Sequence, residues 1–100
     1  MKKVINGKMY NTESAQLKGR ISKGESFGYF MEELYQKKTG EFFIYGEGGA
    51  MTKYSESCGN NNWCGGCKIT PVSEEKAKEW AEEYLDGDEY IEIFGEPEEW

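Results

Sequence analysis

The stretch SEEKAKEWAEEYLDG, residues 73–87, predicts an amphipathic helix. Ser73 is a favoured N-cap, glutamates in the first turn complement the helix dipole, and Asp86-Gly87 is a stop signal. Apolar side chains recur at i, i+3, i+4, i+7 and i+8 and so share one face: Ala77, Trp80, Ala81, Tyr84 and Leu85. A helix with one apolar face needs an apolar surface to cover, so we expect it to pack on a sheet.

The residues before this helix predict two β-hairpins. Residues 3–11 place Asn6-Gly7 between short apolar stretches, and that dipeptide readily takes the positive φ values of a tight turn. Residues 27–35 and 41–46 are rich in aromatic and β-branched side chains and flank a turn-like segment. These two runs are expected to pair as the second hairpin.

Two shorter elements complete the expected fold. A strand at residues 68–72 leads into the long helix, and a second helix is expected over residues 88–94, with Tyr90, Ile91 and Phe94 inward. The expected fold class is α+β, an antiparallel sheet of four or five strands, largely from two hairpins. One amphipathic C-terminal helix covers one face of this sheet, and a Cys-rich loop precedes the last strand.

Composition and the N-terminus limit the class of protein. Fifteen of the 100 residues are aromatic, which argues against disorder, and the length suits one modest core, so we expect a single domain over residues 1–100. Lys2 and Lys3 lead into a polar turn before any apolar segment, so no secretory signal is expected. No apolar run approaches the ~18 residues that a membrane-spanning helix requires. These features favour a cytoplasmic protein, in which clustered cysteines bind metal more often than they pair.

The cysteines give the main chemical signal. Cys58, Cys64 and Cys67 fall within ten residues, and the two-residue spacing of the second pair presents two thiolates to one tetrahedral metal, most naturally zinc. A structural zinc would also staple a long Gly/Asn-rich connection. The chain has no histidine and no fourth cysteine, so the fourth ligand stays open between a carboxylate such as Glu56 or Glu47, a water and another chain.

Two other interpretations of the cysteines stay open. The thiols are unligated, or Cys64 and Cys67 form a redox pair or a disulfide. The redox interpretation is the weaker, because a thioredoxin-like pair sits at the start of a helix, whereas residues 68–72 look extended.

Charge is distributed unevenly along the chain. Residues 73–100 contain 12 acidic and two basic residues, a net of −10, whereas residues 1–72 carry +3, which together give the −7 of the chain. A strongly acidic segment repels bare phosphate and attracts basic protein surfaces, above all grooves that hold nucleic acid. Carboxylates on a polar helix face are usually solvated rather than catalytic. We therefore expect a binding protein, not an enzyme, and no direct binding of nucleic acid.

Four segments of the chain carry a resemblance to a known family. They are residues 10–15 (YNTESA), 34–43 (LYQKKTGEFF), 46–54 (GEGGAMTKY) and 73–80 (SEEKAKEW). The chain resembles short proteins encoded on phages and other mobile elements of Gram-positive bacteria, and the likeness spans most of its length. Small acidic proteins of this origin include type II-A anti-CRISPR proteins, which inhibit Cas9. In the family, polar residues often replace Cys64 and Cys67, which implies that a metal would stabilise this member in particular.

The resemblance and the charge together imply one mechanism. Cas9 holds its guide and target in positively charged channels, so an acidic helix face docked there would block loading of target DNA without any chemistry. The expected partner-binding residues are seven carboxylates and one aromatic anchor: Glu75, Glu79, Glu82, Glu83, Asp86, Asp88, Glu89 and Trp100. The runner-up is a zinc-stapled adaptor that binds another host or phage protein. A third possibility is a small thiol oxidoreductase with a reactive Cys64.

Overall fold

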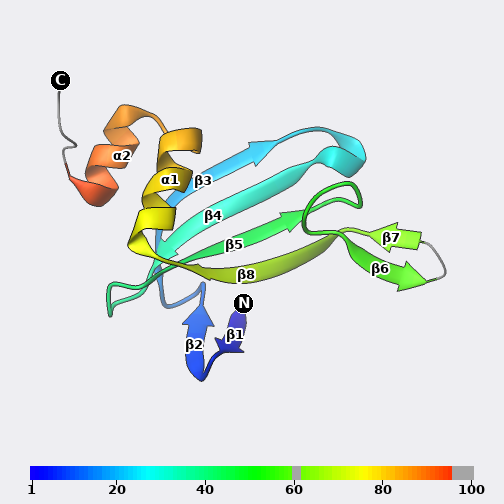
Figure 1. Ribbon diagram of the computed structural model, residues 1–100, viewed down its shortest axis with the longest axis horizontal. Helices are drawn as coiled ribbons and strands as arrows, with labels where there is room; N and C mark the ends of the chain where they lie inside the picture. The colour runs from blue at the N-terminus through cyan, green and yellow to red at the C-terminus, as the bar shows by residue number, and fades with distance from the viewer. Residues whose placement is uncertain (60–61, 96–100) are drawn as a thin grey trace.

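The computed structural model describes residues 1–59 and 62–95, and its centre is a four-stranded antiparallel sheet (Figure 1). The strand order is β3-β4-β5-β8, with the bounds β3 Gln16–Lys23, β4 Phe30–Gln36, β5 Phe42–Gly48 and β8 Gly66–Val72. β4 and β5 form the predicted second hairpin, in which Gln36 pairs with Phe42 and Phe30 with Gly48. The expected α+β fold class is confirmed.

Two helices follow the last strand and lie at one end of the sheet (Figure 1). Their bounds are α1 Glu74–Tyr84 and α2 Gly87–Phe94. Ala77, Trp80 and Ala81 of α1 are buried against Leu34 of β4 and Phe42 of β5, which confirms the predicted apolar face of the long helix. Within the described part of the chain, neither helix is long and apolar enough to cross a membrane.

α2 differs from its prediction in one side chain. Tyr90, Ile93 and Phe94 pack against the core beneath α1, and the Phe94 ring centroid lies 5.5 Å from that of Phe42. Ile91, expected to point inward, is 39% exposed. Positions i, i+3 and i+4 share one face of a helix, whereas the residue after Tyr90 is rotated from it by about 100°.

The first hairpin forms a two-stranded sheet of its own. Its strands are β1 Lys2–Ile5 and β2 Lys8–Asn11. Asn6 and Gly7 make the predicted turn, with φ values of 52° and 77°. Tyr10 packs on Tyr35 and Phe43, which point away from the helices because successive strand residues face opposite sides. The main sheet therefore takes its edge strand from β3, which the sequence analysis did not anticipate. Of this hairpin, Tyr10 and Ile5 pack against the second face of the sheet, and most of its other side chains are exposed.

The region expected to be a Cys-rich loop contains a small hairpin. β6 Glu56–Gly59 and β7 Asn62–Cys64 pair antiparallel at the end of the molecule away from the helices (Figure 1). A disulfide between Cys58 and Cys64 links the two strands. Their side chains are mostly exposed, so the sequence contains no alternation of apolar and polar residues that would have predicted them.

Candidate partner-binding surface

α1 is fixed to the sheet by a capped start and a buried polar contact. The Ser73 side-chain oxygen accepts a hydrogen bond from the Lys76 N–H at 3.1 Å, which is the predicted N-cap. Further along the helix, Trp80 Nε1 donates to Glu32 Oε1 of β4 at 3.0 Å. Gly19 of β3 lies beneath Leu85 and Trp80, where a Cβ would come within 2.8 Å of a Leu85 methyl group and 3.3 Å of the indole ring. These contacts decide which side of α1 faces the sheet and therefore which side faces solvent.

Glu32 is a buried carboxylate that the sequence analysis missed. It is 1% exposed and accepts hydrogen bonds from Trp80 Nε1 and the Tyr54 hydroxyl, while Lys53 Nζ lies 2.7 Å from its Oε2. Burial alone would raise the pKa of Glu32, but the hydrogen bonds from Lys53, Tyr54 and Trp80 outweigh it and hold the pKa below its ordinary value. Burial, and then the Glu32 carboxylate, raise the pKa of Tyr54. Glu32 therefore ties α1 and the segment before β6 to β4.

The expected carboxylates of α1 lie together on its solvent side. We call this surface the acidic face, and its residues are all exposed. Glu75, Glu79, Glu82 and Glu83 recur at helical spacing opposite the buried alanines and tryptophan, and Asp86 follows the helix as the N-cap of α2. Among the described residues, the one ion pair on this face joins Lys76 Nζ to Glu79 Oε2 at 3.3 Å, and both side chains are more than half exposed. The other carboxylates are exposed and take part in no ion pair of the described residues, so the acidic face carries an excess of negative charge.

The first turn of α2 extends this negative surface. Asp86 accepts a hydrogen bond from the Glu89 N–H at 2.9 Å, and Glu89 Oε1 accepts one from the Asp86 N–H at 3.5 Å, a capping box. Both carboxylates also interact favourably with the helix dipole, so part of their charge stabilises α2. Asp88 is exposed, whereas Trp100, the expected aromatic anchor, lies outside the described residues.

The three cysteines lie near the far end of the sheet. Cys58 and Cys64 form the disulfide, whereas Cys67 of β8 is a free, exposed thiol. Zinc binds thiolates, and residues 1–59 and 62–95 contain no group of three or more His, Cys, Asp or Glu side chains placed to hold a metal. Glu56 pairs with Cys64 in strand register and Glu47 with Cys67, so both expected carboxylate ligands neighbour cysteines. The zinc site stays a prediction, and it applies to the reduced chain.

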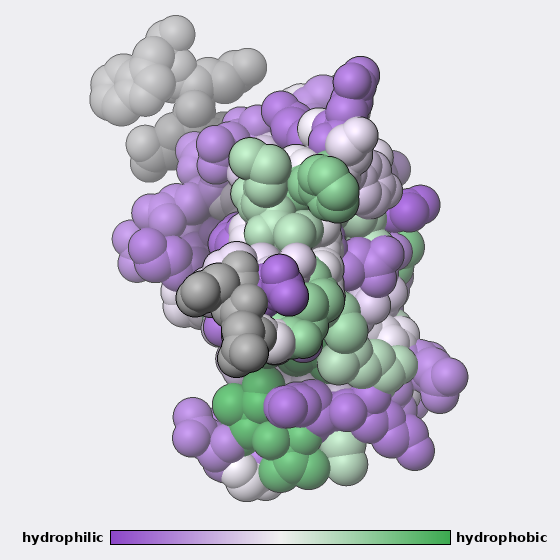
Figure 2. Space-filling model, turned by 90° about the vertical axis from the view of Figure 1, so that its right-hand side faces the viewer, coloured by the Kyte–Doolittle hydropathy of each residue, from purple (hydrophilic) through white to green (hydrophobic). Residues whose placement is uncertain are grey.

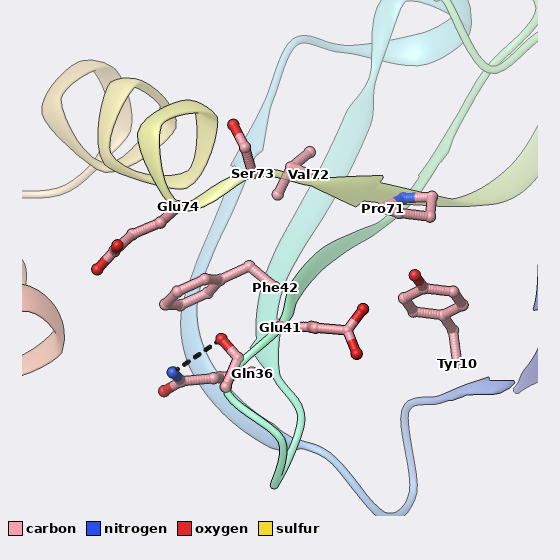
Figure 3. A pocket seen from close by; sticks show the side chains of 9 residues that line it. Tyr10, Gln36, Glu41, Phe42, Pro71, Val72, Ser73 and Glu74 are labelled. Carbon is pink, nitrogen blue, oxygen red and sulfur yellow. Dashed lines mark hydrogen bonds between the residues drawn. The ribbon is translucent and has the colours of Figure 1, made fainter. Parts of the chain in front are cut away.

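A cavity of about 520 Å³ opens at the N-terminal end of α1 (Figure 3). Glu41 points into it toward Tyr10 (Figure 3), and its carboxylate accepts a hydrogen bond from Lys8 Nζ at 3.2 Å. On the same wall, Gln36 Nε2 donates to the Gly40 carbonyl at 3.2 Å. The first contact links β2 to the β4–β5 turn, and the second stabilises that turn.

The end of the molecule with β6 and β7 exposes apolar side chains. Phe27 of the short helix η1 (Ser26–Gly28), Met51 and Trp63 are 68%, 79% and 61% exposed. The Met51 N–H donates to the Phe27 carbonyl at 2.9 Å, so these two residues are neighbours. Figure 2, which views this end, shows apolar surface between hydrophilic side chains. Exposed aromatic side chains are typical of protein contacts, and the sequence analysis had not singled these out.

The chain was compared with protein-family models, curated proteins and solved structures, and none of the three comparisons found a match.

Proposed function

We propose that this protein binds a basic nucleic-acid channel of another protein through the acidic face and the first turn of α2, and that the partner is type II Cas9. The observation that carries the proposal is the separation of the two sides of α1, with carboxylates exposed on one and the core residues buried on the other. The choice of Cas9 depends on the resemblance of residues 10–15, 34–43, 46–54 and 73–80 to the mobile-element family.

The energetics of α1 support a binding role for its charges. Within α1, Glu75 and Glu79, and Glu79 and Glu83, are like charges at four-residue spacing. Each such pair destabilises a helix by about 0.2–0.5 kcal/mol. These exposed glutamates do not pack in the core, so the fold itself gives no reason for this repulsion. A cationic channel would remove this repulsion. The contacts of Trp80 and Glu32 also keep α1 ordered before binding, so little conformational entropy is lost on docking.

The proposal is tested by reversing charge on the acidic face. In a cleavage assay with guide-loaded Cas9, the triple variant Glu79→Lys, Glu82→Lys, Glu83→Lys should inhibit at least about tenfold less well than the parent protein, because rim charges control association. The matched control reverses three exposed acids elsewhere, Glu13, Glu25 and Glu56, with the same change in net charge. This control should keep its inhibition. Equal inhibition by both triple variants and the parent protein rules out the acidic face.

The alternative is an adaptor that binds a different protein. The exposed Phe27, Met51 and Trp63 favour this alternative, because aromatic and methionine side chains supply much of the energy of protein contacts. Under it, purified Cas9 does not bind, and a partner captured from host lysate is lost with Phe27→Ser and Met51→Ser but kept with the Glu79, Glu82 and Glu83 reversals.

A further inference from the structure

A second cavity, of about 450 Å³, lies between three segments that are distant in sequence. Lys8 of β2, Ser14 of the β2–β3 connection and Lys38 of the β4–β5 turn each contribute a wall. In Figure 1 this connection and this turn lie close together below the helices. The volume falls within the range of about 300–1,000 Å³ that is usual for sites that bind small molecules.

The walls of this cavity concentrate positive charge in a protein whose net charge is −7. Lys8, Lys37 and Lys38 line it, and among the described residues that line it Glu41 is the one acidic side chain. Lys8 Nζ lies 3.2 Å from Glu41 Oε2, and Lys37 Nζ lies 3.7 Å from Glu41 Oε1. The Glu41 carboxylate thus pairs with two ammonium groups, and the described lining residues have a net charge of +2.

Lys37 is held in place before any ligand arrives, whereas the Lys8 side chain is 60% exposed and is oriented by its ion pair with Glu41. The Lys37 side chain is 19% exposed, and its Nζ lies 4.4 Å from the centroid of the Tyr10 ring. Glu41, which orients Lys8 and Lys37, is itself fixed by a hydrogen bond from Thr39 Oγ1 to its Oε1 at 3.2 Å. Preorganised donors lose less conformational entropy when a ligand binds, so this arrangement favours binding of an anion.

The remaining walls suit a ligand that is not a bare ion. Met9, which is 50% exposed, and Ala15 supply apolar surface, and the hydroxyl groups of Ser14 and Thr39 line the same cavity. Lysine is a common phosphate ligand and hydroxyl groups add hydrogen bonds to phosphate oxygens. We propose that this cavity binds a small organic phosphate, with the phosphate group between Lys8, Lys37 and Lys38 and the organic part against Met9.

This binding site is separate from the acidic face. None of the α1 or α2 carboxylates lines the cavity, so binding of a small phosphate and binding of a basic protein channel can succeed or fail independently.

The test uses adenosine monophosphate as the probe and ¹⁵N-labelled full-length protein. Saturable shifts of the amides of residues 8–15 and 37–41 are expected, with no such shifts from adenosine, which lacks the phosphate. Lys38→Ala removes a cation that takes part in no ion pair of the described residues and should weaken binding about tenfold, the usual effect of one charged hydrogen bond. Lys68→Ala, an exposed lysine of β8, is the matched control and should leave the affinity unchanged.

The absence of saturable shifts up to about 10 mM probe, well above the micromolar to millimolar range of ordinary sites, would overturn the proposal. Equal shifts with adenosine would overturn it, and so would equal losses of affinity in Lys38→Ala and Lys68→Ala. A single-stranded DNA 12-mer, run in parallel, separates the sources of phosphate. Binding of the oligonucleotide alone, without binding of the mononucleotide, would also contradict a small-molecule site.

Discussion

α1 and the β6–β7 hairpin are held in place by different forces. Ala77 and Ala81 of α1 are fully buried and Trp80 is hydrogen-bonded to Glu32 beneath it, so burial fixes the helix. The hairpin exposes nearly all of its side chains and depends on its strand pairing and on the Cys58–Cys64 disulfide. Hydrophobic burial leaves a periodic pattern in the sequence, whereas a covalent link between exposed strands does not.

The two tryptophans give the largest expected contrast between these regions. Trp80→Ala should lower the free energy of unfolding by about 3–5 kcal/mol, because it leaves a cavity in the core and removes a hydrogen bond to Glu32. Trp63→Ala in β7 should change it by less than about 0.5 kcal/mol, because the side chain is exposed. Urea unfolding followed by far-UV circular dichroism measures both, and similar losses would show that α1 is not fixed by burial.

Glu32 should make the helix end of the molecule sensitive to acid. Its folded pKa lies below the ordinary value of 4.5, so its contribution to stability is complete above that value and is lost as the pH falls through the folded pKa. Glu32→Gln removes the ion pair with Lys53 and should cost about 1.5–3 kcal/mol at neutral pH.

A comparison of the parent protein with Glu32→Gln separates the effect of this β4 carboxylate from the effects of the carboxylates on α1. Unfolding is measured for the parent protein and for Glu32→Gln between neutral pH and pH 3. The gap in unfolding free energy should narrow in acid, and a gap that stays constant would contradict the assigned role of Glu32.

The disulfide should affect the hairpin alone. The double variant Cys58→Ser, Cys64→Ser removes a cross-link of sequence separation 6. Chain entropy predicts that the free energy needed to open the hairpin then falls by about 2 kcal/mol. Amide hydrogen exchange should quicken in β6 and β7 and stay unchanged in α1. Faster exchange in both regions would mean that the hairpin supports the sheet.

Reduction of the same disulfide also tests the zinc prediction. Glutathione and thioredoxin would keep the pair reduced in a cytoplasm, where thiolates of Cys58, Cys64 and Cys67 become available. The reduced protein should then retain about one zinc ion after dialysis, and Cys67→Ser should retain less. If the reduced protein retains no zinc, the prediction of a structural zinc site is wrong.

The sequence predicted the elements whose pattern is local. α1, α2 and two of the hairpins follow from caps, turns and periodicity. β3 escaped notice because Leu17 is exposed and the register shifts between Leu17 and Gly19, which interrupts the alternation. The alternation of β4 does place Glu32 on the same side as Leu34, the one signal that could have shown its burial. Its partner Trp80 lies 48 residues away, however, and contacts of that range have no local pattern.

The candidate surface could be predicted as charge but not as geometry. The seven carboxylates are evident in the sequence, and the helical spacing predicted a common side for Glu75, Glu79, Glu82 and Glu83. The sequence did not show that two of them, Asp86 and Glu89, also cap α2. The exposed Phe27 and Met51 come together only through the contact between η1 and the segment after β5.

Site-directed photo-crosslinking to guide-loaded Cas9 compares the two ends of the molecule directly. A photoreactive amino acid replaces Glu82 of the acidic face in one variant and Trp63 of the β6–β7 hairpin in another; both positions are exposed. The account predicts a covalent adduct with Cas9 from position 82, lost when excess target-mimicking DNA fills the channel, and none from position 63. An adduct from position 63 alone, or from neither position, would contradict it.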